Sequence, residues 1–148
     1  MDIVTTILSV AKSVGVSGSL LLAVCSHESN GFTQNYAPMD VNSPSYGSCQ
    51  LKQATVEMLG FKGDPNQLMD PQKNAYWAAR YLKYQQERYG DDWVRLAAAY
   101  NAGSYSESSK VPGCPRNLGY IKKVKKRLPL ELQNRLECGR NWELAEGL

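Results

Sequence analysis

Apolar residues recur every three to four positions over most of the chain, a spacing that is typical of amphipathic helices. The clearest case begins at Pro71, where Asp70 would cap the helix, and ends at Gly90. The full pattern predicts helices at 3–14, 18–29, 54–59, 71–89, 92–100 and 117–128, with one more helix in the tail that ends at residue 148.

Residues 31–52 interrupt the helical period. This stretch contains Pro38 and Pro44 among several Asn, Ser and Gly residues, a composition that favours turns and loops. Any sheet should therefore be small and confined to this stretch. The length of 148 residues fits one domain over residues 1–148, and the pattern predicts that it is predominantly α-helical.

Glu28 lies at the end of an apolar stripe. Leu21, Val24, Cys25 and Glu28 are spaced so that they share one face of the predicted helix at 18–29. A carboxyl group that faces the interior, in the last turn of a helix, is disfavoured in its ionised form, so we expect a raised pKa. A carboxyl that keeps its proton can act as a general acid. Exposure at a frayed helix end, or pairing with an arginine, remains the alternative.

Composition narrows the class of protein. Of the 148 residues, 43% are hydrophobic and 21% are charged, which is typical of a soluble globular domain. No apolar run reaches the roughly 20 residues that span a bilayer, so membrane insertion is not expected. The net charge is +3, and the segment 122–127 is strongly basic. We favour a solvated helix face over a polyanion-binding surface, and nucleic acid is not an expected partner because no groove-reading motif is present.

The four cysteines, Cys25, Cys49, Cys114 and Cys138, form no C-x-x-C pair, and His27 is the only histidine, so no metal site is expected. Buried free thiols are expected, although the even count permits one or two disulfides and a Cys25–Cys49 bridge stays open. Cys25 and His27 are too close in sequence to face each other as nucleophile and base. Cys49 with His27 remains geometrically possible.

Four short segments occur in a recognisable order: "SHESNGF" at 26–32, "YGSCQLK" at 46–52, "AAYNAGS" at 98–104 and "GYIKKV" at 119–124. Together they resemble the lytic transglycosylase domain of soluble lytic transglycosylases, which is similar to goose-type lysozyme. The resemblance spans about residues 18–127. It implies a lysozyme-like α+β fold that is predominantly α-helical, and cleavage of the β-1,4 bond between N-acetylmuramic acid and N-acetylglucosamine in peptidoglycan.

The resemblance also implies roles for single residues. Glu28 matches the catalytic acid and base. The positions that match residues binding substrate or lining the cleft are Ser29, Gly47, Gln50, Tyr100, Asn101 and Tyr120. Two departures stand out, because Ser48-Cys49 replaces the usual Leu-Met and 117–119 replaces the Glu-Thr-Arg run before the late tyrosine. Without the resemblance, Tyr100 and Tyr120 would be interpreted as core residues and Gly103 as a helix cap.

A single carboxyl group suffices for the implied reaction. Glu28 would protonate the glycosidic oxygen and then take a proton from the muramic acid C6 hydroxyl, which gives a 1,6-anhydro sugar without a cofactor or metal. The main competing reaction is hydrolysis, in which Asp40, Asp64 or Asp70 would supply a second carboxylate. Two competing functions stay open, those of a non-catalytic glycan-binding relative and of a cell-envelope peptidase or amidase.

The start of the sequence lacks the basic residues of a signal peptide. We therefore expect a protein that is made in the bacterial cytoplasm and acts on glycan strands in the cell wall or periplasm. We also expect it to be a monomer. One route is that of a phage endolysin released by a holin-type partner. The second is that of a component of a phage particle or a secretion apparatus.

Overall fold

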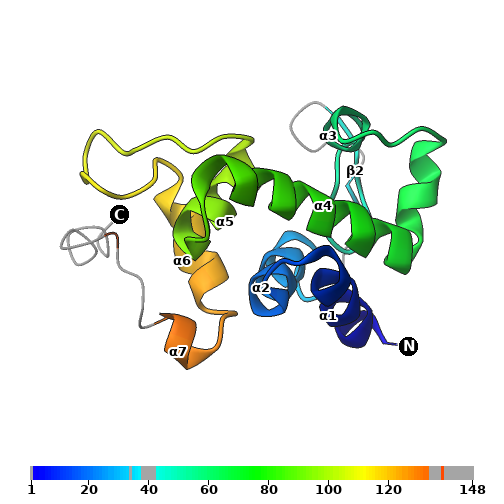
Figure 1. Ribbon diagram of the computed structural model, residues 1–148, viewed down its shortest axis with the longest axis horizontal. Coiled ribbons are helices and arrows are strands. Elements are labelled where there is room, and N and C mark those ends of the chain that lie inside the picture. Colours follow the sequence, from blue (N-terminus) through cyan, green and yellow to red (C-terminus); the bar gives the residue numbers. More distant parts are fainter. Residues whose placement is uncertain (1, 34, 38–42, 134–137, 139–148) are drawn as a thin grey trace. The chain divides into compact units, whose positions relative to one another are not determined.

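The computed structural model describes residues 2–33, 35–37, 43–133 and 138. The chain divides into two compact units, Met1–Lys83 and Tyr84–Leu148. Helices make up most of the described structure, and α4 runs from the first unit into the second (Figure 1). The prediction of one domain over the whole chain stays a prediction.

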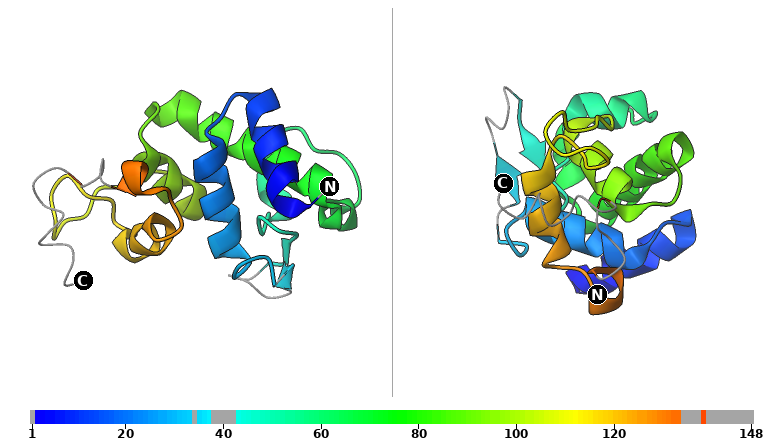
Figure 2. Two further views of the ribbon diagram at one scale, coloured as in Figure 1. Left: turned by 90° about the horizontal axis from the view of Figure 1, so that it is seen from below. Right: turned by 90° about the vertical axis from the view of Figure 1, so that its left-hand side faces the viewer.

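The first unit begins with α1 (Ile3–Val14) and α2 (Gly18–Glu28), which lie side by side (Figures 1 and 2). The side chain of Ser17 caps α2 by accepting a hydrogen bond from the Leu20 amide at 3.1 Å. Gly15 ends α1 in the left-handed conformation, with φ of 90°. Both helices begin and end within one residue of their predicted bounds, because local capping signals define them.

The segment between α2 and α3 contains a small antiparallel sheet of β1 (Tyr36–Ala37) and β2 (Ser45–Tyr46). Tyr36 pairs with Tyr46 across the two strands, and the centroids of their rings are 5.4 Å apart. The prediction of a small sheet in this stretch is confirmed.

Three helical segments follow: α3 (Gln53–Met58), the 3₁₀ helix η2 (Pro65–Met69) and the long α4 (Pro71–Tyr89), of which residues 71–83 belong to the first unit. The sequence pattern did not predict η2. Asp70 caps α4 as predicted, because its carboxylate accepts a hydrogen bond from the Lys73 amide at 2.9 Å. The small residues Ala75, Ala78 and Ala79 on α4 are buried, which permits close packing of its neighbours.

The second unit contains α5 (Trp93–Ala102), α6 (Leu118–Lys125) and α7 (Leu130–Gln133). On α6, which overlaps the basic segment 122–127, the apolar residues Leu118, Ile121 and Val124 are buried. The Trp93 indole donates a hydrogen bond to the Leu132 carbonyl at 3.1 Å and so connects the start of α5 to α7. The prediction of one further helix in the tail is met by α7, and the part of the tail after it lies almost wholly outside the described residues.

All four cysteines are paired, in the disulfides Cys25–Cys49 and Cys114–Cys138. The expectation of free buried thiols was therefore wrong. Sequence spacing does not reveal these pairs, because each closes a separation of 24 residues through the tertiary fold. Over the described parts of the chain, we find no helix that is both long and apolar enough for a membrane span.

Candidate active site

Glu28 is the last residue of α2, and its side chain is half-buried. Leu21, Val24 and Cys25, which share its face of the helix, are each 0% exposed. The predicted stripe is therefore a buried face, and the carboxylate lies where that face reaches the surface. The helix does not fray before Glu28, since the next amide, that of Ser29, still donates to the Cys25 carbonyl at 3.0 Å. The raised pKa of Glu28 stays a prediction.

The turn after Glu28 is held by Ser29, whose side chain is 0% exposed. The Ser29 hydroxyl donates to the Cys25 carbonyl at 2.9 Å and accepts from the Phe32 amide at 3.1 Å. Its single proton is therefore used within the chain, and this geometry supports an orienting role for Ser29 rather than a contact with sugar. Asn30, Gly31 and Phe32 all have positive φ, of 52°, 69° and 68°. Positive φ costs about 1–3 kcal/mol at a non-glycine residue and is concentrated at functional sites.

Gly47 and Gln50 lie in a tight turn that Tyr46 and Leu51 close through two backbone hydrogen bonds of 2.9 Å. Gln50 itself has a φ of 52°, and its side-chain amide donates to the Gly47 carbonyl at 3.0 Å. Gln50 is half-buried, so part of its side chain reaches the surface. The turn therefore holds the Gln50 amide in a fixed orientation.

Asn74, on α4, holds this turn from behind and is 0% exposed. Its side-chain oxygen accepts from the Cys49 amide at 2.8 Å, and its nitrogen donates to the carbonyls of Tyr46 and Leu68, each at 2.8 Å. A Cβ added to Gly47 would lie 2.6 Å from the Leu68 carbonyl oxygen and closer still to the Asn74 amide. Position 47 therefore requires glycine both for this contact and for its φ of 76°.

Sequence reasoning missed Asn74. Its partners lie up to 28 residues away in the chain, so no local pattern connects them. One signal was present, because Asn74 is a polar residue four positions before Ala78, on the buried face of α4. A buried amide on an apolar face needs partners, and such a residue is a candidate for a structural hydrogen-bond network.

The Cys25–Cys49 disulfide joins the two elements that carry predicted site residues. Cys25 precedes Glu28 by about one helical turn, and Cys49 is the residue before Gln50. Both cysteines are 0% exposed. The bridge therefore fastens the end of α2 to the Gly47–Gln50 turn and accounts for the departure at position 49. It also removes the Cys49–His27 pair as a candidate nucleophile and base, because a disulfide sulfur is not a thiolate.

We expect the double replacement of Cys25 and Cys49 by alanine to lower the free energy of unfolding by about 2–4 kcal/mol, the usual effect of removing a disulfide. Activity should fall as well, since Glu28 and Gln50 lose their covalent link. Thermal unfolding and cell-wall solubilisation measure the two effects. The matched control is the alanine pair at Cys114 and Cys138, which leaves the first unit intact. An unchanged activity in the first pair, together with a normal melting temperature, would contradict the positioning role.

The remaining predicted residues belong to the second unit. Tyr100 is buried and Asn101 is exposed at the end of α5, while Tyr120 is half-buried on α6. The Asn117 amide nitrogen donates to the Asn101 side-chain oxygen at 2.8 Å and to the Ala98 carbonyl at 3.0 Å. Asn117 thus fixes the orientation of Asn101, which presents its own nitrogen as a donor. Sequence reasoning treated Asn117 only as a departure from the family pattern.

Tyr105 comes directly after the family segment at 98–104 and lies near the Arg95 guanidinium and the Tyr89 ring. The Arg95 guanidinium is 5.3 Å from its ring centroid, and the Tyr89 ring centroid is 6.0 Å away. Burial raises the pKa of the Tyr105 hydroxyl and outweighs the opposing effect of Arg95. The hydroxyl therefore keeps its proton at neutral pH and can act as a hydrogen-bond donor.

The candidates for a second carboxylate have other roles where they are described. The Asp64 carboxylate accepts from the Asn66 amide at 2.9 Å and caps η2, and Asp70 caps α4. Asp40 lies outside the described residues. Among the residues that the structure describes, we find no cluster of His, Cys, Asp and Glu that could hold a metal ion.

Comparison with known proteins supports the sequence resemblance. Residues 6–111 match the model of the transglycosylase SLT domain. A similar solved structure is that of an inactive mutant of the lytic transglycosylase Slt from Pseudomonas aeruginosa, with 27% sequence identity and a TM-score of 0.56. The match covers 67% of this chain but only 16% of the Slt chain. The predictions of a lytic transglycosylase-type domain and of a lysozyme-like, predominantly helical α+β fold are confirmed. The chain belongs to the transglycosylase SLT domain family.

Proposed function

We propose that the protein degrades peptidoglycan as a lytic transglycosylase that cleaves the β-1,4 bond between N-acetylmuramic acid and N-acetylglucosamine. The observation that carries the proposal is the position of Glu28. Its carboxylate ends a fully buried helical face, followed by a turn with three consecutive positive φ angles. The family match over residues 6–111 supports the same reaction class.

In the proposed reaction, Glu28 first donates its proton to the glycosidic oxygen, and the bond to the anomeric carbon breaks through a state with oxocarbenium character. The resulting carboxylate then removes the proton of the muramic acid C6 hydroxyl. That oxygen bonds to the anomeric carbon and closes a 1,6-anhydro ring. The proton that Glu28 gave is thereby replaced, and no water is consumed.

Other residues would bind and orient the glycan. The side-chain amides of Gln50 and Asn101 are held by hydrogen bonds to Gly47 and Asn117, so each has a fixed orientation. Amides held in this way suit recognition of hydroxyl and N-acetyl groups, because little rotamer entropy is lost on binding. We assign Tyr100 and Tyr120 to the same substrate-binding set, and Ser29 and Gly47 to positioning of the site.

The competing functions have less support. A hydrolytic muramidase needs a second carboxylate, and the two described candidates, Asp64 and Asp70, cap helices instead. A cysteine peptidase needs a thiolate, and all four cysteines are in disulfides. A non-catalytic glycan-binding relative is disfavoured because Glu28 occurs together with Gln50, Tyr100 and Asn101, which match the family's site positions. We also propose that the protein acts as a monomer, either as a phage endolysin or within a phage particle or secretion apparatus.

The reaction class can be tested on purified peptidoglycan sacculi. We expect the protein to release soluble fragments with shortened glycan strands and no increase in free amino groups. Chromatographic sizing of the strands and a colorimetric amine assay measure the two quantities. New amino groups on strands of unchanged length would instead identify an amidase or peptidase.

A further inference from the structure

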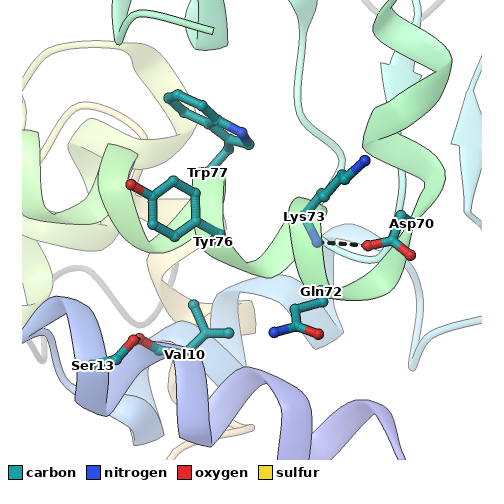
Figure 3. Close-up of a pocket in the computed structure, with 7 residues that line it drawn as sticks. All are labelled: Val10, Ser13, Asp70, Gln72, Lys73, Tyr76 and Trp77. Carbon is teal, nitrogen blue, oxygen red and sulfur yellow. Dashed lines mark hydrogen bonds between the residues drawn. The ribbon is translucent and has the colours of Figure 1, made fainter.

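The first unit contains a hollow of about 420 Å³ between α1 and the beginning of α4 (Figure 3). Val10 and Ser13 of α1 line one side. The other side is formed by the cap and the first two turns of α4, residues 70–77. Neither Glu28 nor Gln50 is among the lining residues, so the hollow is distinct from the candidate active site. Its volume falls in the range of small-molecule sites.

Two aromatic side chains of α4, Tyr76 and Trp77, line the hollow. Their ring centroids are 5.2 Å apart at an interplanar angle of 86°, so the two rings stand nearly perpendicular. Tyr76 is 39% exposed, a large apolar surface to leave in water. Tyrosine and tryptophan together offer apolar ring faces with a polar edge, which suits a ligand that has both kinds of surface.

Neighbouring side chains contact both rings of the aromatic pair. The Arg80 guanidinium donates to the Tyr76 hydroxyl at 2.8 Å and lies 5.4 Å from the Trp77 ring centroid. Phe61 packs edge-on against Trp77, with ring centroids 5.5 Å apart. A surface that is already ordered loses little conformational entropy on binding. This arrangement is therefore suited to recognition.

Polar groups complete the lining. Gln72 and Lys73 are exposed, and the Ser13 hydroxyl donates to the Val10 carbonyl at 2.9 Å, which leaves its oxygen able to accept. Lys73 contributes one positive charge and Asp70 one negative charge, so the lining has no net charge. A neutral ligand rich in hydroxyl and amide groups matches this lining better than an anionic polymer.

We infer that this hollow binds a sugar unit of a β-1,4-linked N-acetylhexosamine strand, as a second contact outside the active site. The apolar C–H face of a pyranose ring would pack on Tyr76 and Trp77. Its hydroxyl and N-acetyl groups would bond to Gln72, Lys73 and Ser13. The identity of the strand rests on the proposed function, since peptidoglycan is the polymer that supplies it. A second contact would keep the enzyme on an insoluble substrate between cleavage events.

The test uses chitotetraose, a soluble β-1,4-linked N-acetylglucosamine tetramer, and the Glu28→Gln protein, in which the substrate is not consumed. We expect amide NMR signals of Gln72, Lys73, Tyr76 and Trp77 to shift on titration. The Tyr76→Ala change should raise the dissociation constant obtained from these shifts at least about tenfold. Tyr76→Phe keeps the ring and should leave that constant close to its original value. Met58→Ala removes an exposed apolar side chain of α3 that does not line the hollow, and it should have no effect.

The outcome is independent of catalysis. Absence of shifts at these four residues, or equal shifts in Tyr76→Ala, would overturn the inference even if the wild type cleaves peptidoglycan. If the hollow shows these shifts but the wild-type protein does not cleave peptidoglycan, the inference is supported and the proposed function is contradicted. Stronger shifts with a polyanion such as polyphosphate than with chitotetraose would also overturn it.

Discussion

Replacing Glu28 with glutamine should lower the rate of sacculus solubilisation by about 10²–10⁴-fold, the usual contribution of a general acid or base. Glutamine has nearly the same shape as glutamate, but it cannot donate a proton to the glycosidic oxygen. Since the residue lies at the half-buried end of α2, the substitution should leave the melting temperature close to that of the wild type. Turbidity loss of a sacculus suspension measures the rate.

The matched control is Glu57→Gln, the same chemical change in the same unit. Glu57 is exposed on α3. Among the contacts that the structure describes, its carboxylate accepts one hydrogen bond, from the exposed Gln53 side chain at 3.2 Å. Its replacement should leave both rate and stability unchanged. If Glu28→Gln and Glu57→Gln solubilise sacculi equally fast, Glu28 is not the catalytic acid.

Replacing Asn74 with alanine should lower the free energy of unfolding by roughly 3 kcal/mol or more, because each buried group left unpaired costs about 1–3 kcal/mol. The change would strand the Cys49 amide and the carbonyls of Tyr46 and Leu68. Activity should fall at temperatures where the protein is still folded, since the turn that carries Gln50 loses its support. Urea unfolding and sacculus solubilisation measure the two effects.

Asn66→Ala provides the comparison, because Asn66 is an exposed asparagine of η2 in the same unit. That substitution should change the free energy of unfolding by less than about 0.5 kcal/mol, as is usual for surface positions. If Asn74→Ala lowers the free energy of unfolding by less than about 1 kcal/mol, the three hydrogen bonds contribute less to stability than their burial indicates.

The helices could be predicted because their boundaries are local. Ser17 and Asp70 cap helices through amides three residues ahead, and Gly15 ends α1 through its own left-handed backbone. The 3₁₀ helix η2 was missed since it has only five residues and no room for a hydrophobic period. Short 3₁₀ segments depend on their neighbours more than on a pattern of their own.

The candidate site could be predicted only in part. Periodicity placed Glu28 on the buried face of α2, and the family resemblance added the residues around it. The hydrogen bonds of Asn74 and Asn117 join residues up to 28 positions apart, so neither could be found by spacing. The sequence left a Cys25–Cys49 bridge open and gave no sign of Cys114–Cys138, because a disulfide depends on the distance between side chains in the folded chain.

In the proposed reaction, a hydroxyl of the sugar itself, rather than water, completes the cleavage after Glu28 has given up its proton. Mass spectrometry of the fragments released from sacculi by the wild-type protein tests this directly. We expect 1,6-anhydro-muramic acid ends, each one water lighter than a reducing end. Fragments that carry reducing muramic acid ends from the first minutes of digestion would contradict it.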